Sequence, residues 1–132
     1  VAEQQTAHAR DTALASAENI LQANPDIAAF VGVNENSGMA ILSAATSAGL
    51  SDLYITTVDA TAENMAAIRD GKVAIGVSQD PYKMGYTAVE QAIKWCQGEE
   101  TDEFIEVPVE YMDKDNIQDF IDREKGYGVE VE

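Results

Sequence analysis

The pattern of apolar and polar positions between residues 27 and 48 predicts a buried strand followed by a helix. The apolar run Ile27 to Val33 has β-formers at its centre, as expected for a strand that is covered on both faces of a parallel sheet. The next residues, Asn34 to Ser37, supply helix-capping chemistry, and Gly38 to Ala48 continues as a helix of small residues. The unit is therefore a strand, a polar strand end and a helix.

The same order of elements returns twice along the chain. Further strands are predicted at Leu53–Val58 and Lys72–Ser78, each followed by a helix, one capped by Thr61 and the other opened by Asp80. Repeated β–α–β units imply right-handed crossovers and a parallel sheet. We therefore expect an α/β fold, with an open parallel sheet and helices on both faces, in a single domain over residues 1–132.

The outer parts of the chain complete this picture. An apolar stripe predicts a helix from about Thr6 to Asn24, ahead of the first strand. Phe104 to Tyr111 is largely apolar, but Pro108 restricts it to an edge strand or an extended crossing. A last short helix is predicted to end at Ile121, and the tail GYGVEVE is expected to be loose or a short added strand.

Three polar residues mark the ends of the predicted strands, namely Asn34, Asp59 and Gln79. In an open α/β sheet the ligand crevice lies outside the carboxyl ends of the strands. These residues are therefore our candidate binding site. Taken singly, each of them could instead serve only as a cap or turn residue.

Charge and cysteine content exclude several classes of partner and cofactor. The chain has 132 residues and a formal net charge of −16, which disfavours nucleic acid and anionic membrane surfaces as partners. No apolar run approaches the roughly 18 residues of a membrane span, and the N-terminus has no pattern of a signal peptide. A single cysteine, Cys96, permits no disulfide within the chain, and no metal-ligand spacing or cofactor motif occurs. We expect no metal and no cofactor.

Enzymatic activity is also not expected. His8 is the only histidine and lies near the terminus, so no Ser–His–Asp set can be assembled around it. A response-regulator receiver domain is a sharper alternative, with Asp59 as its phosphoacceptor. That domain would need an acidic pair at another strand end and a lysine at the last one, whereas this chain has Ser78 and Gln79 there.

Three stretches of the sequence resemble a known family. They are ANPDIAAFVGVNENSGMAILSAATSAG, YITTVDATAENMAAIRDGKVAIGVSQDPYKMGYTAVEQA and VPVEYMDKDNI. They resemble the type I periplasmic sugar-binding proteins of the ribose/galactose type, solute-binding proteins of ABC transporters, and the related effector domains of lactose-repressor-type regulators. The resemblance covers about Thr6 to Ile121 and includes Asn-Pro-Asp before the first strand, Val-Asp closing the second and Gln-Asp-Pro after the third.

The resemblance implies that this chain is the C-terminal lobe of a two-lobe protein that closes over a pentose or hexose. Its implied partners are a monosaccharide, a missing N-terminal lobe and an ABC transporter permease. The protein would be extracytoplasmic, either periplasmic or a membrane-anchored lipoprotein. The alternative output is sugar sensing by a transcription regulator. In intact members, the helix Tyr82–Gln97 belongs to the other lobe, so here it must repack or find a partner.

The resemblance also maps Asn34, Asp59 and Gln79 onto ligand contacts. Side chains with two coplanar polar atoms can bridge adjacent sugar hydroxyls, and the carboxylate of Asp59 gives the stronger, charge-assisted bonds. His8 falls where many members carry an aromatic residue that stacks on the sugar, although it could be only an exposed polar residue. Glu35 is interpreted as helix-start charge. The aromatic residues of the late helix and edge strand are expected to pack in the core or between lobes: Tyr82, Tyr86, Trp95 and Tyr111.

Overall fold

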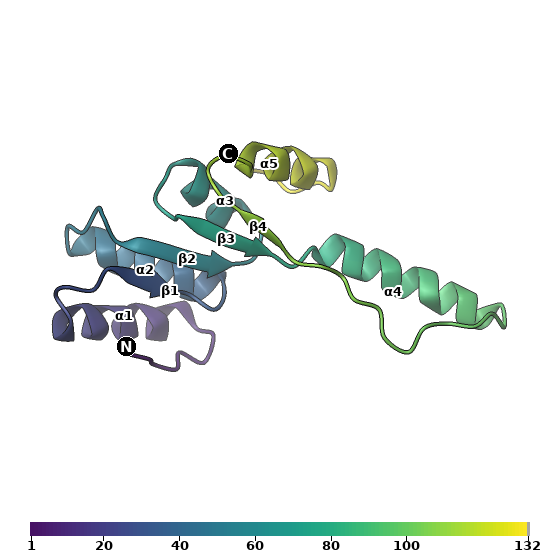
Figure 1. The fold of residues 1–132 in the computed structure, drawn as a ribbon, viewed down its shortest axis with the longest axis horizontal. Helices are drawn as coiled ribbons and strands as arrows, with labels where there is room; N and C mark the ends of the chain where they lie inside the picture. The colour runs from purple at the N-terminus through teal and green to yellow at the C-terminus, as the bar shows by residue number, and fades with distance from the viewer. Residues whose placement is uncertain (132) are drawn as a thin grey trace.

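The computed structural model describes residues 1–131, which form five helices and a four-stranded sheet (Figure 1). In chain order the elements are α1 (Arg10–Ala23), β1 (Ala29–Val31), α2 (Glu35–Ser47), β2 (Tyr54–Val58), α3 (Ala62–Arg69), β3 (Ile75–Ser78), α4 (Pro81–Cys96), β4 (Glu110–Met112) and α5 (Ile117–Gly126). The predicted alternation of strands and helices is confirmed, and the architecture is a single α/β lobe.

The sheet has the order β1-β2-β3-β4. The first three strands are parallel, as predicted, with Phe30 opposite Ile55 and Thr57 opposite Gly76. The fourth strand is antiparallel to β3, so the sheet is mixed and the expectation of a wholly parallel sheet was wrong at this edge. The cause is the connection: the chain leaves β3 through α4 and returns alongside it, so β4 runs in the opposite direction (Figure 1).

The helices cover one face of the strands, which differs from the expectation of helices on both faces. Alternate residues that face α2 and α3 are buried, such as Phe30, Ile55 and Thr57. Their neighbours on the other face are open, with Val31 71% and Tyr54 49% exposed. The strands β1 and β2 therefore present a partly apolar surface that no described element covers.

Two glycines let the start of α2 approach the sheet closely. A Cβ on Gly32 would lie 2.5 Å from the backbone nitrogen of Gly38, and a Cβ on Gly38 would collide with the side chain of Thr57. Such distances are below normal van der Waals contact, so neither position tolerates a larger side chain without displacing α2. This close approach places the N-terminus of α2 at the ends of β1 and β2, where the candidate site lies.

The ends of the chain differ from the prediction in detail. The first helix begins at Arg10 rather than near Thr6, because Ala7 and His8 have positive φ values of 49° and 60°, outside the helical region. The last helix continues past Ile121 to Gly126. The tail forms no added strand within the described residues, but Val131 is buried in the core. The last residue, 132, lies outside the described residues.

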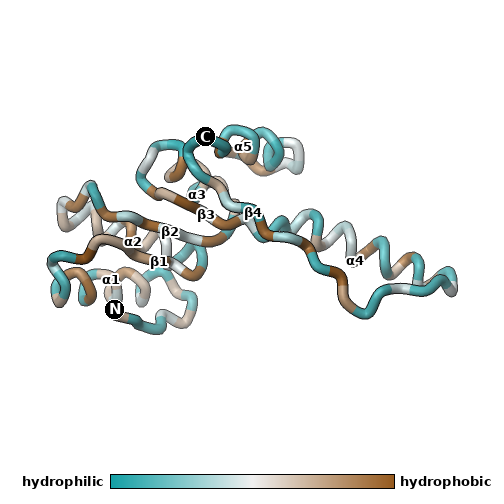
Figure 2. Tube along the Cα trace, viewed as in Figure 1, coloured by the Kyte–Doolittle hydropathy of each residue, from teal (hydrophilic) through white to brown (hydrophobic). Residues whose placement is uncertain are grey.

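Helix α4 extends away from the rest of the structure, and none of its residues is buried (Figure 1). Figure 2 shows that apolar residues nevertheless lie along it. The four late aromatic residues are exposed, so the interpretation of them as core residues was wrong: Tyr82, Tyr86, Trp95 and Tyr111. The ring of Tyr82 stacks on that of Tyr127, with centroids 3.8 Å apart, where α4 leaves the sheet. Packing against another lobe stays a prediction.

Candidate functional site

The carboxylate of Asp59 is at the centre of the cluster of strand-end residues. Gln79 Nε2 donates a hydrogen bond to Asp59 Oδ1 at 3.0 Å, and the backbone N–H of Glu35 donates to Asp59 Oδ2 at 3.3 Å. Glu35 is the first residue of α2, so the carboxylate faces the positive end of that helix. Each carboxylate oxygen can accept more than one hydrogen bond, so both keep capacity for a ligand hydroxyl.

Asn34 lies at the end of β1 and is the N-cap of α2. Its Oδ1 accepts from the backbone N–H of Ser37 at 2.9 Å, and the Ser37 side chain accepts in turn from the Asn34 backbone, which completes a capping box. The Thr57 hydroxyl donates to the Asn34 carbonyl at 3.1 Å. These bonds fix Asn34 beside β2, so the capping role predicted for this residue type is confirmed.

His8 lies against Asn34, although the two residues are far apart in the sequence. Asn34 Nδ2 is 2.9 Å from His8 Nδ1, and Asn36 Nδ2 donates to the His8 carbonyl at 3.1 Å. The amide of Asn34 has two hydrogens, and the contact with His8 uses one of them. His8 and Gln79 are exposed, whereas Asn34 and Asp59 are partly buried, so the cluster is accessible from solvent.

The structure therefore brings Asn34 together with His8, and Asp59 together with Gln79, around the start of α2. Their geometry suits the recognition of a neutral, hydroxyl-rich molecule, since the amides donate and accept while the carboxylate accepts. Binding itself stays a prediction for each of the four residues.

Two residues of the site were not predicted from the sequence. The backbone N–H of Glu35 donates to the Asp59 carboxylate, whereas the sequence predicts a role only for the charge of the Glu35 side chain. Glu35 Oε1 accepts a hydrogen bond from the Thr61 hydroxyl. Asn64, three positions after the Thr61 cap, is the second of these residues. In the structure its side chain is fully buried and donates to the Asp59 carbonyl. No pattern in the sequence indicates this contact, because it depends on the turn after β2.

Charged groups around the site are paired across elements. Arg10 of α1 forms two hydrogen bonds with the carboxylate of Glu63 on α3, which lower the pKa of Glu63. Where α4 leaves the sheet, burial raises the pKa of Glu124, and the negative charge of Asp80 adds to this effect. Arg123 lies beside Glu124 and donates to Glu110 at 2.6 Å. No group of three or more potential metal ligands occurs among residues 1–131.

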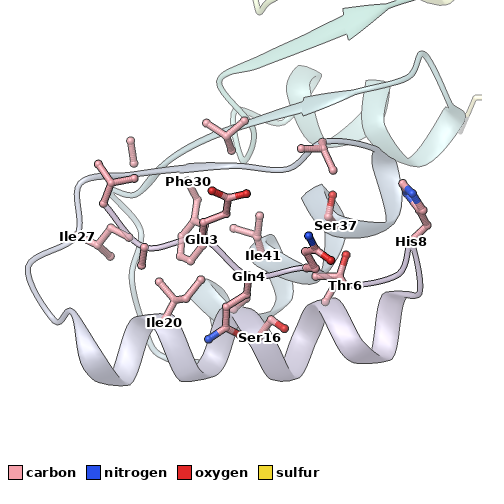
Figure 3. Close-up of a pocket in the computed structure, with 18 of the residues that line it drawn as sticks. Glu3, Gln4, Thr6, His8, Ser16, Ile20, Ile27, Phe30, Ser37 and Ile41 are labelled. Atoms are coloured by element: carbon pink, nitrogen blue, oxygen red, sulfur yellow. The ribbon is translucent and has the colours of Figure 1, made fainter.

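A cavity of about 740 Å³ lies at the open edge of β1, apart from the Asp59 cluster. It is bordered by α1, β1 and the N-terminal segment, and Figure 3 shows Glu3 and Gln4 of that segment lying between α1 and β1. Among the four predicted site residues, only His8 borders it. Its lining is largely apolar, including Ile20, Phe30 and Ile41, so it resembles an incompletely filled core rather than a polar binding site.

Comparison with known proteins decides the family. The model of the periplasmic binding protein domain matches residues 1–100. This chain belongs to that family. The ribose import binding protein of Escherichia coli is 35% identical over 82 residues, which are 62% of this chain and 28% of the relative. The ribose import binding protein of Bacillus subtilis is 31% identical over 100 residues, which are 76% of this chain and 32% of the relative.

Solved structures of this family have the same fold. An ABC transporter periplasmic solute-binding protein from Actinobacillus succinogenes with bound D-allose aligns with a TM-score of 0.88 and 27% identity, over 90% of this chain and 43% of the other. A solute-binding protein from Agrobacterium vitis with bound D-fucose gives a TM-score of 0.83 and 26% identity, over 98% and 43% of the two chains. The periplasmic binding protein domain described here thus spans less than half of these relatives. No helix within residues 1–131 is long and apolar enough to cross a membrane.

Proposed function

We propose that this periplasmic binding protein domain is the C-terminal lobe of a two-lobe protein that binds a small sugar, a pentose or hexose, and delivers it to an ABC transporter. The observation that carries the proposal is the carboxylate of Asp59, which is held between Gln79 Nε2 and the Glu35 N–H at the carboxyl ends of parallel strands. This is the place in an open α/β sheet where ligands bind. The named relatives are binding proteins rather than enzymes, in agreement with the expectation from the sequence.

The ligand class follows from the side chains and from the relatives. Asn34, Asp59 and Gln79 offer two amides and one carboxylate, the set that can bridge neighbouring hydroxyls of a sugar ring. His8 adds an imidazole ring at the edge of the same cluster. The relatives are named for ribose, and the structures contain D-allose and D-fucose. These names favour transport over the alternative of a sugar-sensing domain in a lactose-repressor-type regulator.

A missing N-terminal lobe is supported by three surfaces of the structure. Helix α4 has no buried residue, with Tyr86 63% and Trp95 72% exposed. The uncovered face of β1 and β2 exposes Val31 and Tyr54. The strand β1 lies at the edge of the described sheet, beside the cavity. Apolar surface of this extent is unusual on a monomer and is typical of contact with further protein. Relatives of more than twice the matched length would supply such contacts.

The implied cellular setting follows from the same relatives. The family and its solved members are named as periplasmic, so we place this protein outside the cytoplasmic membrane, either free in a periplasm or anchored as a lipoprotein. The transporter permease would be the second protein partner. The formal net charge of −16 fits neither nucleic acid nor an anionic membrane as a partner.

The proposal is tested by calorimetry of the two-lobe protein and of this chain alone against a panel of pentoses and hexoses that includes D-ribose, D-allose and D-fucose. We expect the two-lobe protein to bind at least one sugar by lobe closure. This chain alone should bind the same sugar weakly or not at all, because half of the contacts are absent. Micromolar binding by this chain alone, or no binding by the two-lobe protein to any sugar of the panel, would contradict the proposal.

A further inference from the structure

The backbone of Asp59 is in a conformation that residues with a side chain rarely adopt. Its φ angle is +84°, immediately after the last residue of β2. Its N–H still donates to the Val77 carbonyl at 2.8 Å, so the strand pairing continues up to this residue and the chain then turns. A non-glycine residue with positive φ persists only where its surroundings hold it, and such residues concentrate at binding and catalytic sites. The group that holds Asp59 is therefore of functional interest.

That group is the side-chain amide of Asn64. It is completely buried, and its Nδ2 donates to the carbonyl of Asp59 at 2.5 Å and lies 3.5 Å from that of Val58. Two consecutive carbonyls at the turn therefore face one amide nitrogen that carries two hydrogens. Asn64 is itself fixed at the start of α3, because its backbone N–H donates to the Thr61 hydroxyl at 3.3 Å.

The oxygen of the Asn64 amide indicates which part of the side chain is useful at this position. Asn64 Oδ1 is buried and has no hydrogen-bond partner among the described residues. A buried polar atom without a partner destabilises the fold, and this cost offsets part of what the hydrogen bonds of Nδ2 contribute to stability. The benefit of asparagine here lies in its donor, which is directed at the turn that presents the carboxylate of Asp59.

We propose that Asn64 is a positioning residue of the ligand site: its buried amide fixes the left-handed turn at Asp59 and so directs the Asp59 carboxylate toward Gln79 and the ligand. This inference rests on the proposed function for its effect on sugar binding, but not for its effect on the backbone. Aspartate at position 64 would place acceptor oxygens against two carbonyls, and leucine would remove the donor while keeping a similar volume.

The test compares Asn64→Leu and Asn64→Asp with the wild type in the two-lobe protein. Sugar affinity is measured by calorimetry, stability by thermal unfolding, and the φ angle of Asp59 by NMR, in which a strong intraresidue amide–Hα contact marks a positive φ. We expect Asn64→Leu to weaken sugar binding by about tenfold or more while Tm changes little, because the loss of the donor to two carbonyls is offset by removal of the unpartnered Oδ1. The signature of positive φ at Asp59 should weaken with it. Should the leucine variant not fold, Asn64→Asp keeps the side-chain volume. It is expected to show the same loss of sugar affinity and the same loss of the positive-φ signature at Asp59.

Asn116→Leu is the matched control. Asn116 Nδ2 also donates to a backbone carbonyl, that of Tyr111 at 3.0 Å, but at the turn between β4 and α5, away from Asp59. We expect this variant to lower Tm and to leave sugar affinity unchanged. The proposal is overturned if the folded variants at position 64 keep both wild-type affinity and the NMR signature of Asp59, or if they lose only stability, as the control does. If the wild type binds no sugar of the panel, the proposed function fails, while the NMR measurement still decides whether Asn64 holds the turn.

Discussion

Gln79 Nε2 donates to Asp59 Oδ1 over 3.0 Å, and this bond joins side chains from the ends of two neighbouring parallel strands, β3 and β2. Because the Glu35 N–H binds the other carboxylate oxygen, both oxygens of Asp59 are oriented before any ligand arrives. A group that is already oriented loses little conformational entropy on binding, so its hydrogen bonds contribute more to affinity. Asp59 should therefore be the most sensitive position of the site.

Replacing Asp59 by alanine in the two-lobe protein is expected to cost about 2–3 kcal/mol of sugar-binding free energy, because a charged hydrogen-bond partner is lost. Isothermal titration with the preferred sugar measures this loss. Asp26→Ala is the matched control, since Asp26 is an exposed carboxylate that precedes β1, at the opposite end of that strand. An unchanged titration for the Asp59 variant would remove this residue from the site.

The contact between Asn34 and His8 predicts a specific tautomer of the imidazole. Asn34 Oδ1 already accepts from Ser37, so its amide nitrogen faces His8 Nδ1, which must then be the acceptor and leave the proton on Nε2. Long-range proton–nitrogen NMR of the neutral ring should show this Nε2–H form. In Asn34→Asp, which keeps a good N-cap, the carboxylate accepts instead and the proton should move to Nδ1. The same tautomer in both proteins would show that the contact does not form in solution.

The elements that sequence patterns predicted well are those fixed by local chemistry. The cap at Thr61 and the N-cap at Asp80 are formed as expected, since each depends on residues three positions apart. The strand ends Asn34, Asp59 and Gln79 could be found because the carboxyl ends of parallel strands meet at one edge.

Long-range features could not be predicted in this way. The pairing of His8 with Asn34 and of Asn64 with the Asp59 carbonyl depends on turns with positive φ at residues that are not glycine. The reversed direction of β4 depends on the path of the chain around α4, which no local pattern specifies. The sequence could not decide whether the aromatic residues of α4 pack in the core or between lobes, because an amphipathic pattern does not specify what the helix packs against.

The buried carboxyl of Glu124 predicts a dependence of stability on pH. Burial raises its pKa in the folded state, so the folded protein binds this proton more tightly than the unfolded chain does, and stability falls as pH rises through the interval between the two pKa values. Glu124→Gln removes the buried charge and should raise Tm at pH 7. Below the ordinary pKa of glutamate the variant and the wild type should converge, because both side chains are then neutral.

Thermal unfolding between pH 3 and pH 8 measures this difference. Glu18→Gln is the control, since Glu18 is an exposed glutamate on α1 and its replacement should change Tm little at either end of the range. Arg123 keeps Glu110 as a partner in the Glu124 variant, so loss of that ion pair does not confound the result. A variant that is less stable than the wild type at pH 7 would show that the pairing of Glu124 with Arg123 outweighs its burial.

The exposed face of α4 makes Trp95 a direct probe of the proposed second lobe. Trp95 is the only tryptophan of the sequence and is 72% exposed, so this chain alone should fluoresce with the red-shifted emission of an indole in water. If α4 packs against the other lobe, emission should shift to the blue in the two-lobe protein, and quenching by acrylamide should weaken, because apolar contact removes water from the ring.

A tryptophan-free second lobe keeps the signal specific to Trp95. Tyr54→Trp in a Trp95→Phe background is the matched probe on the uncovered sheet face, so a shift confined to one of the two positions identifies which surface the lobe covers. Identical emission and quenching at position 95 with and without the second lobe would show that α4 is not part of the contact.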